Sequence, residues 1–380
     1  MTRPLNQPVR VGMVARCLNS EHMRGMGKYV YELLAHGRQQ PALQWRLYGD
    51  DPRYGMLTPP DSTAEVDIFP FRGDRFQAWE QLGLPLRARS NQLDLLHCSE
   101  GSLPLWQPIP TVVTVHDTLA WEERDDTAGA RLYFDRLLPA ALKASTAVIT
   151  ISANSQTDIL ARFPWLEHKL SVIPHGIDAA FFDATTTDVA PAGLWQRLAG
   201  APYALYVGGP MQRKRADWAI AAFAACQQPD LKLVLCGFGS AARRTAEQAL
   251  EPQLRGRVLF AEFVSDAELR ALYRGARAVL YPTLYEGFGF PALEAQAAGT
   301  PVLMSALGSL KELIGPLAMV LPAHDLVAWS AALDQACQLG ETRAALAAKT
   351  APWVRQFVWQ TSFERHHALY RRVAGKEAAR

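Results

Sequence analysis

Short apolar runs typical of strands alternate along the chain with longer stretches whose apolar residues recur at helical spacing. In the first half the strand-like runs are VRVGMVA, LDLLHCSE, TVVTVHD and AVITISA, and the helical pattern GKYVYELLAHG follows the first of them. The same rhythm restarts with YALYVGG, LKLVLCGFG, RVLFAEF, AVLYPT and PVLMSA. This alternation is typical of βαβ units around a parallel sheet. We therefore predict an α/β protein with two Rossmann-like domains.

A connection between the two domains is expected near residue 190. The segment VIPHGID reads as a strand entering a turn, and the residues that follow it are rich in Ala, Thr and Pro. A length of 380 residues suits two domains of about 150 to 200 residues each. The last stretch, PWVRQFVWQTSFERHHALYRRVAG, has the spacing of amphipathic helices. We predict an N-terminal domain over 1–190, a C-terminal domain over 191–360, and a C-terminal helix over 361–380 that packs back towards the N-terminal domain.

Composition narrows the class of protein. With 49% hydrophobic residues the chain can fill two cores, and a formal net charge of +2 gives no overall attraction to nucleic acid. The five cysteines are scattered without a Cys-x-x-Cys pair, which disfavours zinc ligation and a secreted disulfide framework. No segment approaches the ~18 apolar residues of a spanning helix or the pattern of a signal peptide. We expect a cytoplasmic protein.

The segment 281–299, YPTLYEGFGFPALEAQAAG, carries the most informative chemistry. Glu286 and Glu294 flank a Gly-Phe-Gly-Phe-Pro turn that opens a helix. Gly287 and Gly289 remove side chains where a ligand could approach the backbone, and the proline suits the first helical turn. The amides of such a helix N-terminus favour a diphosphate or hydroxyl groups. A plainer interpretation is that Glu294 complements the helix dipole and that the glycines form an ordinary connection.

A second candidate segment is 206–215, YVGGPMQRKR, in which a strand ends at two glycines and three cations follow. In a parallel sheet this loop lies at the carboxyl edge, where ligands bind. Arg213 and Lys214 could then offset the charge of a diphosphate without a metal. The alternative for this triplet is a solvated basic face.

The first half offers weaker signals. Gly25 and Gly27, in RGMGKY, form a glycine turn before a helix, but the sequence is neither a Walker A loop nor a complete dinucleotide fingerprint. A plain strand-to-helix turn and a loop that faces a donor both stay open. His116 and Asp117 end the run TVVTVHD at a carboxyl edge, where the histidine could contact a sugar or fill a structural role. His175, in IPHGID, is expected to stabilise a turn, and His366 and His367 are given no ligand role.

The C-terminal half closely resembles glycosyltransferase family 4. The resemblance rests on YVGGPMQRKRADWAIAAF and on FVSDAELRALYRGARAVLYPTLYEGFGFPALEAQAAGTPVLMSALGSLKEL, and it covers most of 200–325. It extends more loosely to RGMGKYVYELL, TVVTVHD, TISANS and IPHGID. The resemblance implies a GT-B fold, in which two Rossmann-like domains face across a cleft. It also implies that the C-terminal domain binds the donor and the N-terminal domain binds the acceptor.

The resemblance assigns roles to particular residues. Glu286 would lie near the transferred sugar, Glu294 would hold the ribose hydroxyls, and Arg213 and Lys214 would grip the diphosphate. His116 would face the reacting sugar, and with Glu286, Lys214 and Arg213 it completes the implied catalytic set. The family's usual asparagine after the lysine is Arg215 here, and Gln296 replaces a commoner methionine. The implied donor-binding residues are Gly25, Gly27, Gly208, Arg213, Lys214, Phe263, Val264, Glu286, Gly287, Phe288, Gly289, Phe290 and Glu294.

The implied chemistry is retaining hexosyl transfer without a metal or other cofactor. The resemblance to bacterial mannosyltransferases of surface polysaccharide assembly suggests GDP-mannose as donor and a glycan or lipid-linked oligosaccharide as acceptor. UDP-glucose or another UDP-sugar is the alternative donor. A sugar-nucleotide epimerase and a non-catalytic sugar-nucleotide-binding module are the rival functions, and a nicotinamide dehydrogenase is disfavoured because no complete glycine fingerprint is present. Residues 131–143, RLYFDRLLPAALK, could contact the inner face of a membrane or form an ordinary surface helix.

Overall fold

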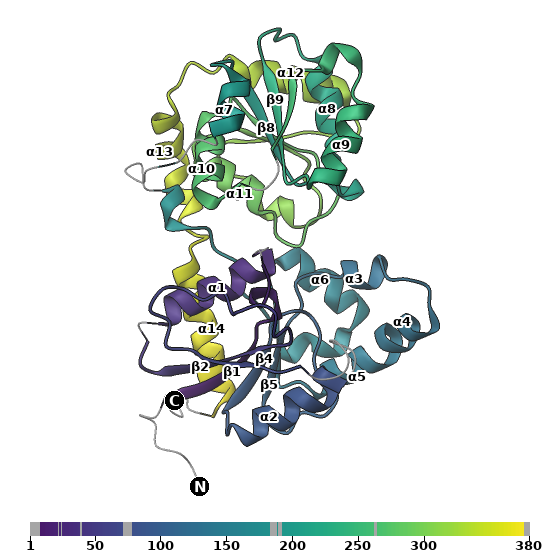
Figure 1. Ribbon diagram of the computed structural model, residues 1–380, viewed down its shortest axis with the longest axis vertical. Helices are drawn as coiled ribbons and strands as arrows, with labels where there is room; N and C mark the ends of the chain where they lie inside the picture. Colours follow the sequence, from purple (N-terminus) through teal and green to yellow (C-terminus); the bar gives the residue numbers. More distant parts are fainter. Residues whose placement is uncertain are drawn as a thin grey trace. The chain divides into compact units, whose positions relative to one another are not determined.

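The protein is built from two α/β units (Figure 1). The computed structural model describes residues 8–21, 23, 25–38, 40–70, 78–182, 188, 192–261 and 264–375. The first unit comprises 1–176 with 359–380, and the second comprises 177–358. The division therefore falls after Gly176 and not at residue 190. The reason is a contact between distant parts of the chain, because the backbone of Ile177 already bonds to that of Phe357 within the second unit.

The first unit contains a seven-stranded parallel sheet in the order β3-β2-β1-β4-β5-β6-β7. Its central strands are buried along nearly their whole length, which explains why they read as continuous apolar runs. The strand order reverses between β1 and β4, and this reversal defines the unit's topological switch point. The strands are β1 (Val9–Val14), β2 (Leu43–Gly49), β3 (Glu65–Ile68), β4 (Leu95–Cys98), β5 (Thr111–Thr114), β6 (Ala147–Thr150) and β7 (Leu170–Val172).

Helices of the first unit include two that begin with a π-helical turn. Pro85 and Pro139 each follow such a turn, and a proline lacks the N–H that a regular α-helical turn would use there. The segment 131–143 is consequently not one regular helix. The helices are η1 (Arg16–Leu18), α1 (Gly25–Gly37), η2 (Trp79–Gly83), α2 (Leu84–Ser90), α3 (Leu119–Glu122), α4 (Ala128–Leu132), η3 (Tyr133–Leu137), α5 (Leu138–Ala144), α6 (Ala153–Arg162), η4 (Pro164–Lys169) and α14 (Trp359–Val373).

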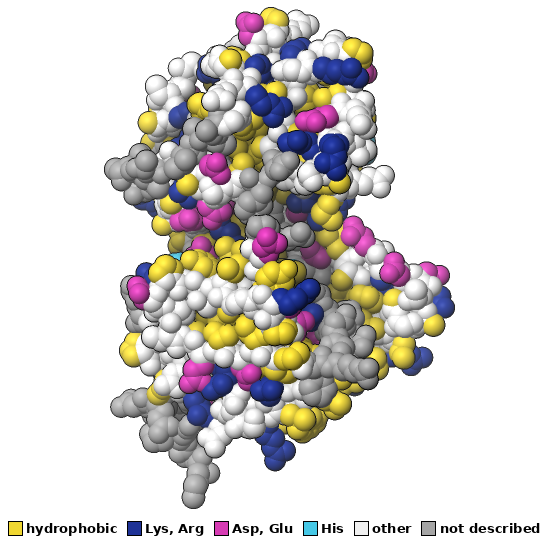
Figure 2. Space-filling model, in the orientation of Figure 1, with side chains coloured by type: hydrophobic (Ala, Val, Ile, Leu, Met, Phe, Trp, Pro, Cys, Tyr) yellow, Lys and Arg dark blue, Asp and Glu magenta, His cyan; other side chains and the backbone are white. Residues whose placement is uncertain are grey.

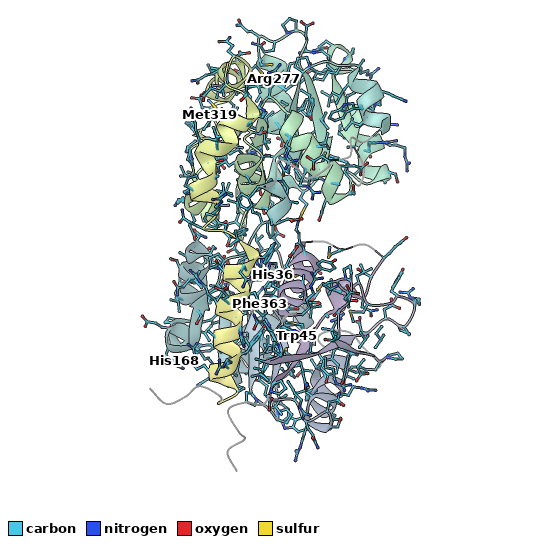
Figure 3. All side chains as sticks on the ribbon, turned by 90° about the vertical axis from the view of Figure 1, so that its left-hand side faces the viewer. His36, Trp45, His168, Arg277, Met319 and Phe363 are labelled. Atoms are coloured by element: carbon cyan, nitrogen blue, oxygen red, sulfur yellow. The ribbon has the colours of Figure 1, made fainter. Side chains whose placement is uncertain are left out.

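The C-terminal helix α14 packs against α1 and β1 of the first unit (Figure 1). Trp45 and Phe363, labelled in Figure 3, both reach Gly37 at the end of α1. A Cβ atom on Gly37 would lie 2.8 Å from the Trp45 ring and 3.1 Å from the Phe363 ring, so a larger residue would push α14 away. The prediction that the last helix returns to the N-terminal part of the chain is confirmed.

The second unit contains a six-stranded parallel sheet in the order β10-β9-β8-β11-β12-β13. Its strand order reverses between β8 and β11, so the loops that follow these two strands diverge from one switch point. The strands are β8 (Tyr203–Val207), β9 (Lys232–Cys236), β10 (Val258–Ala261), β11 (Val279–Tyr281), β12 (Val302–Met304) and β13 (Ala318–Val320).

The helices of the second unit enclose a core that includes the buried rings of Phe223, Phe260 and Trp329. Helix α10 begins with a capping box in which Ser265 and Glu268 bond to each other's backbone. The helices are η5 (Ala179–Phe181), α7 (Ala192–Leu198), η6 (Gln212–Lys214), α8 (Ala216–Ala225), α9 (Ser240–Ala249), η7 (Pro252–Leu254), α10 (Asp266–Gly275), α11 (Phe290–Ala297), η8 (Gly308–Leu313), α12 (Leu326–Cys337) and α13 (Arg343–Val354).

Candidate functional site

The loops after β8 and β11 meet at the switch point of the second unit. The backbone N–H of Leu284 donates to the carbonyl of Arg213 at 2.8 Å, and the Arg213 guanidinium donates to the carbonyl of Tyr285 at 2.8 Å. These two bonds bring together segments that are about seventy residues apart in the sequence. The two motifs singled out in the sequence, 206–215 and 281–299, therefore form one site.

Close backbone packing fixes the loop after β8. A Cβ atom on Gly208 would lie 2.7 Å from the hydroxyl of Tyr206, and that hydroxyl donates to the carbonyl of Gly209 at 2.9 Å. Gly209 has a φ of +72° and approaches the carbonyl of Gly237 in the loop after β9. The glycines are needed here because side chains would separate the two loops.

Two cations share one carboxylate at the centre of the site. Glu286 Oε2 lies 3.2 Å from the Arg213 guanidinium, and Glu286 Oε1 lies 3.5 Å from Lys214 Nζ. The hydroxyl of Thr283 also donates to Glu286 Oε1, at 3.1 Å. Glu286 is only 9% exposed, so these partners compensate for its lost hydration. The local balance is one net positive charge, which favours an anionic ligand.

The glycine turn that opens α11 is also held in place. Gly289 has a φ of +106°, and a Cβ atom there would lie 2.6 Å from the Leu310 side chain. The hydroxyl of Ser309 donates to the carbonyls of Glu286 at 2.6 Å and Phe288 at 2.9 Å. Pro291 occupies the first turn of α11, as predicted. The N-terminus of α11 is thus positioned beside the cluster of Arg213, Lys214 and Glu286, where its partial positive charge adds to theirs.

Glu294 lies one turn into α11 and is 6% exposed. The hydroxyl of Tyr273, from α10, donates to Glu294 Oε2 at 3.0 Å. Burial, and next the charge of Glu294, raises the pKa of Tyr273 well above its ordinary value, so its hydroxyl remains a donor at neutral pH. The carboxylate of Glu294 is therefore held by a neutral partner.

His116 follows β5 in the first unit and is partly buried. Its Nε2–H donates to the carbonyl of Ser99 at 2.8 Å. Burial lowers the pKa of His116, so the ring is neutral near pH 7 and Nδ1 carries no proton. Such a ring can accept a hydrogen bond from a hydroxyl group but supplies no charge.

A chain of buried polar groups lies behind His116. His366 Nε2 shares a hydrogen bond with the Tyr29 hydroxyl at 2.7 Å, and that hydroxyl shares another with Thr114 at 3.0 Å. Thr114 in turn bonds to His97 at 2.8 Å, and His97 bonds to the Tyr370 hydroxyl at 2.6 Å. The chain joins α1, β4 and β5 to α14. No pattern in the sequence indicated it, because members that bond to each other lie up to 337 residues apart.

The remaining predicted residues fall into three groups. Gly27 is buried, and a Cβ atom there would lie 2.7 Å from the Met23 side chain, whereas one on Gly25 would meet open space. Val264 lies in the connection between β10 and α10, and Phe263 lies outside the described residues. Buried Gly287 and Phe288 lie in the turn before α11, and the ring of Phe288 contacts that of Phe290.

Three hydroxyl residues of the site were missed in the sequence: Thr283, Ser309 and Tyr273. Thr283 and Ser309 follow strands β11 and β12 at the carboxyl edge of the sheet, so their positions were a usable signal. Tyr273 lies within the apolar stripe of α10, where spacing indicates only a core residue.

Other features bear on the site more weakly. Within the part of the chain that the structure describes, no group of three or more His, Cys, Asp or Glu side chains is arranged to hold a metal ion. None of the described helices is both long and apolar enough to cross a membrane.

A hollow of about 290 Å³ lies at the edge of the second unit's sheet that is opposite to the site. Trp195, Tyr203 and Arg277 line it (Figure 3 labels Arg277). It contains none of the predicted site residues.

Surface charge is mixed on the face that Figure 2 shows. Lys and Arg side chains lie among Asp and Glu side chains on both units. Within 131–143 and its neighbours, Arg131 pairs with Asp126 and Asp135 pairs with Arg124, while Leu132 is 55% exposed. Contact of this segment with a membrane stays a prediction.

Comparison with known proteins gives consistent matches in both halves. The model of the family "Glycosyltransferase Family 4" matches residues 23–181, and that of "Glycosyl transferases group 1" matches residues 196–353. The Escherichia coli O-antigen chain mannosyltransferase B is 28% identical over 60% of this chain and 61% of its own length. The glycogen synthase of Mycobacterium tuberculosis is 30% identical over 72% of this chain and 67% of its own length. The first of these matches thus spans less than two thirds of the relative.

Solved structures match along almost the whole chain. The sucrose-phosphate synthase of Thermosynechococcus elongatus has a TM-score of 0.74 at 21% identity and covers 98% of this chain and 100% of its own. Anabaena HepE, solved in complex with UDP and glucose, has a TM-score of 0.69 at 18% identity and covers 95% and 99% of the two chains. These likenesses, together with the two parallel sheets, confirm the expected GT-B class of fold.

Proposed function

The chain belongs to glycosyltransferase family 4, and from this premise we propose that it transfers a hexose from a nucleoside-diphosphate sugar to a hydroxyl group of a glycan. The observation that carries the proposal is the cluster of Arg213, Lys214 and Glu286 beside the N-terminus of α11. This cluster combines net positive charge with a helix N-terminus, which is the chemistry that a diphosphate requires.

Arg213 and Lys214 would stabilise the negative charge that grows on the diphosphate as the bond to the sugar breaks. Both side chains are already held by Glu286 before any ligand binds, so little reorganisation is needed during the reaction. The two cations supply the charge that a metal ion provides in other transferases, and the proposed reaction therefore needs no metal.

We propose that the reaction retains the configuration of the sugar. The acceptor hydroxyl would attack the anomeric carbon on the face from which the diphosphate leaves, and a diphosphate oxygen would take the hydroxyl proton. The new bond joins the acceptor oxygen to the anomeric carbon, and the nucleoside diphosphate departs with both electrons of the broken bond. Neutral His116, in the first unit, would accept a hydrogen bond from a sugar hydroxyl.

GDP-mannose is the proposed donor, because relatives of this chain are named as mannosyltransferases of O-antigen chains. A UDP-sugar is the second candidate, because HepE, which shares the fold, was solved with UDP and glucose. The proposed acceptor is a glycan or a lipid-linked oligosaccharide, in line with the same O-antigen relatives. An acceptor of the latter kind would bring the protein to the cytoplasmic face of a membrane.

A turnover assay tests the proposal against its rivals. The protein would be incubated in EDTA with GDP-mannose or UDP-glucose and a panel of mannose-containing oligosaccharides, and the products followed by NMR. We expect release of the nucleoside diphosphate that depends on an acceptor. We also expect an α-linked product from an α-linked donor. Isomerised donor without an acceptor would indicate an epimerase, and bound nucleotide without turnover would indicate a binding module. An inverted product would contradict the retaining mechanism.

A further inference from the structure

Tyr273 is a fully buried phenol whose surroundings fix it from three sides. Its ring contacts that of Phe181 edge to face, with 5.9 Å between ring centroids. Its backbone carbonyl accepts a hydrogen bond from the Thr300 hydroxyl at 2.6 Å. Its own hydroxyl donates to Glu294 Oε2 at 3.0 Å. The position of this hydroxyl is therefore set by the fold and not by the ligand.

The hydrogen bond from Tyr273 constrains how Glu294 can meet a ligand. A carboxylate that is buried within a helix needs donors to replace water, and an unpaired one would be strongly disfavoured. Fixing one of the two carboxylate oxygens also restricts rotation of the carboxylate plane about the last side-chain bond. A carboxylate with a fixed plane discriminates better between a pair of adjacent hydroxyls and a single hydroxyl.

We propose that Tyr273 is a positioning residue that acts through Glu294 to select ribonucleoside over deoxyribonucleoside diphosphates. The inference rests on the proposed function, in which Glu294 holds the ribose hydroxyls of the donor. Tyr273 does not touch the ligand. It keeps the carboxylate in the orientation that two ribose hydroxyls require, and the selected ligand class is a diphosphate on an unmodified ribose.

A matched control variant distinguishes the proposed positioning role of Tyr273 from a merely structural role. Tyr203 is also buried, and its hydroxyl donates at 2.9 Å to the carbonyl of Leu272, the residue that precedes Tyr273 in α10. Tyr203→Phe therefore removes a buried phenol hydroxyl that supports the same helix without touching Glu294. If the effect of Tyr273→Phe came only from a loosened α10, Tyr203→Phe would reproduce it.

Isothermal titration of the full chain with GDP, UDP and their 2′-deoxy and 3′-deoxy counterparts tests the proposal. The quantity compared is the ratio of the deoxy Kd to the ribo Kd for whichever base binds. The wild type should give a ratio of roughly ten, the worth of one hydrogen bond to a charged group. Tyr273→Phe should lower the ratio to about two or three, because it weakens the binding of the ribonucleotide alone. Tyr203→Phe should leave the ratio unchanged.

A second variant keeps the test decisive if Tyr273→Phe folds poorly. Glu294→Gln keeps the size of the side chain and should abolish the discrimination, and Tyr273→Phe added to it should change the ratio no further. A wild type that binds neither diphosphate contradicts the proposed function and this inference together. If the wild type and Tyr273→Phe discriminate equally well, the role of Tyr273 alone is overturned. The same conclusion follows if Tyr273→Phe weakens the binding of ribo and deoxy ligands alike.

Discussion

At the carboxyl edge of the second unit's sheet, two cations each lie within 3.5 Å of one carboxylate, whereas the corresponding edge of the first unit leads to neutral histidines. Both units use the same kind of parallel sheet with a switch point beside its first strand. Burial makes the difference, because it favours the neutral form of a histidine. Glu286 is also buried, but Arg213 and Lys214 lie directly against it. The comparison shows that one scaffold can present charge in one unit and uncharged hydrogen-bonding groups in the other.

The largest expected difference between the units is the loss of stability in mild acid. Burial lowers the pKa of His366 to about 4, and it lowers those of His97, His116 and His175 as well. An unfolded histidine has a pKa of about 6.5, so the unfolded state binds more protons below that pH. The stabilisation by these neutral rings is thus complete above pH 6.5 and is lost as the pH falls. His366 alone should cost about 2 kcal/mol of stability at pH 5.

Hydrogen exchange measured between pH 7 and pH 5 checks this prediction. The second unit serves as the reference, because its only histidine in the sequence is His324, which is exposed. Peptides from the first unit should lose protection beyond the intrinsic change in exchange rate, and α14 should be among them. Peptides from the second unit should not. Equal loss in both units would show that the buried histidines do not control acid stability.

The charged cluster gives the next largest effect. Lys214→Ala removes one of two cations proposed to hold the diphosphate, so kcat/KM should fall by about 100-fold to 1,000-fold. The Kd for the nucleoside diphosphate should rise by about tenfold in the same variant. Steady-state kinetics and titration would measure both quantities. Lys349→Ala, which breaks an exposed pair with Glu341, is the matched control and should leave both unchanged. Wild-type values for Lys214→Ala would remove this residue from the site.

A smaller effect is expected from the neutral histidine. His116→Ala should lower kcat by about tenfold to 100-fold and leave the Kd for the nucleoside diphosphate nearly unchanged, because the ring supplies a hydrogen bond but no charge. His36→Ala provides a control, since His36 lies on α1 of the same unit and contacts Glu32 on its own helix (Figure 3). An increase in Kd as large as that of Lys214→Ala would contradict the contrast between charged and neutral sites.

The smallest expected effect concerns the cation beside the cluster. Arg215 has a φ of +54°, a left-handed conformation that asparagine tolerates better than arginine. Arg215→Asn should gain about 1 kcal/mol from the backbone and lose about 0.5 kcal/mol from the stacking of Arg215 on Trp218. The melting temperature should therefore rise by about 1 to 2 °C. Arg255→Asn, at a φ of −62°, is the control and should give no gain. A loss of stability in Arg215→Asn would mean that stacking outweighs the strain.

The sequence predicted what depends on local pattern. The alternation of strands and helices indicated both sheets. The motifs around Arg213 and Glu286 follow β8 and β11, which are neighbouring parallel strands of one sheet, so both motifs lie at the same edge of that sheet. The left-handed turn at Arg215 gives a physical reason for the asparagine that is usual in the family. These features need only neighbouring residues and the general geometry of a parallel sheet.

Contacts between residues that are distant in the sequence could not be predicted from the sequence pattern. The bond between Tyr273 and Glu294 joins two helices whose apolar spacing indicates core residues and nothing more. His97 and Tyr370 are 273 residues apart, and only the return of α14 to the first unit brings them together. The division after Gly176 follows from the pairing of Ile177 with Phe357, which is likewise not local.

The most direct test of the central claim, that the cluster of Arg213, Lys214 and Glu286 binds the diphosphate of a nucleotide sugar, is a thermal-shift panel in EDTA. GDP, UDP, ADP, GDP-mannose, UDP-glucose and UDP-GlcNAc would each be added to the wild type and to Lys214→Ala. Ligands of one base at about 100 times Kd should raise the melting temperature of the wild type by about 5 to 10 °C, and they should shift Lys214→Ala far less. No shift with any of them in a folded sample, or equal shifts in both proteins, would contradict the claim.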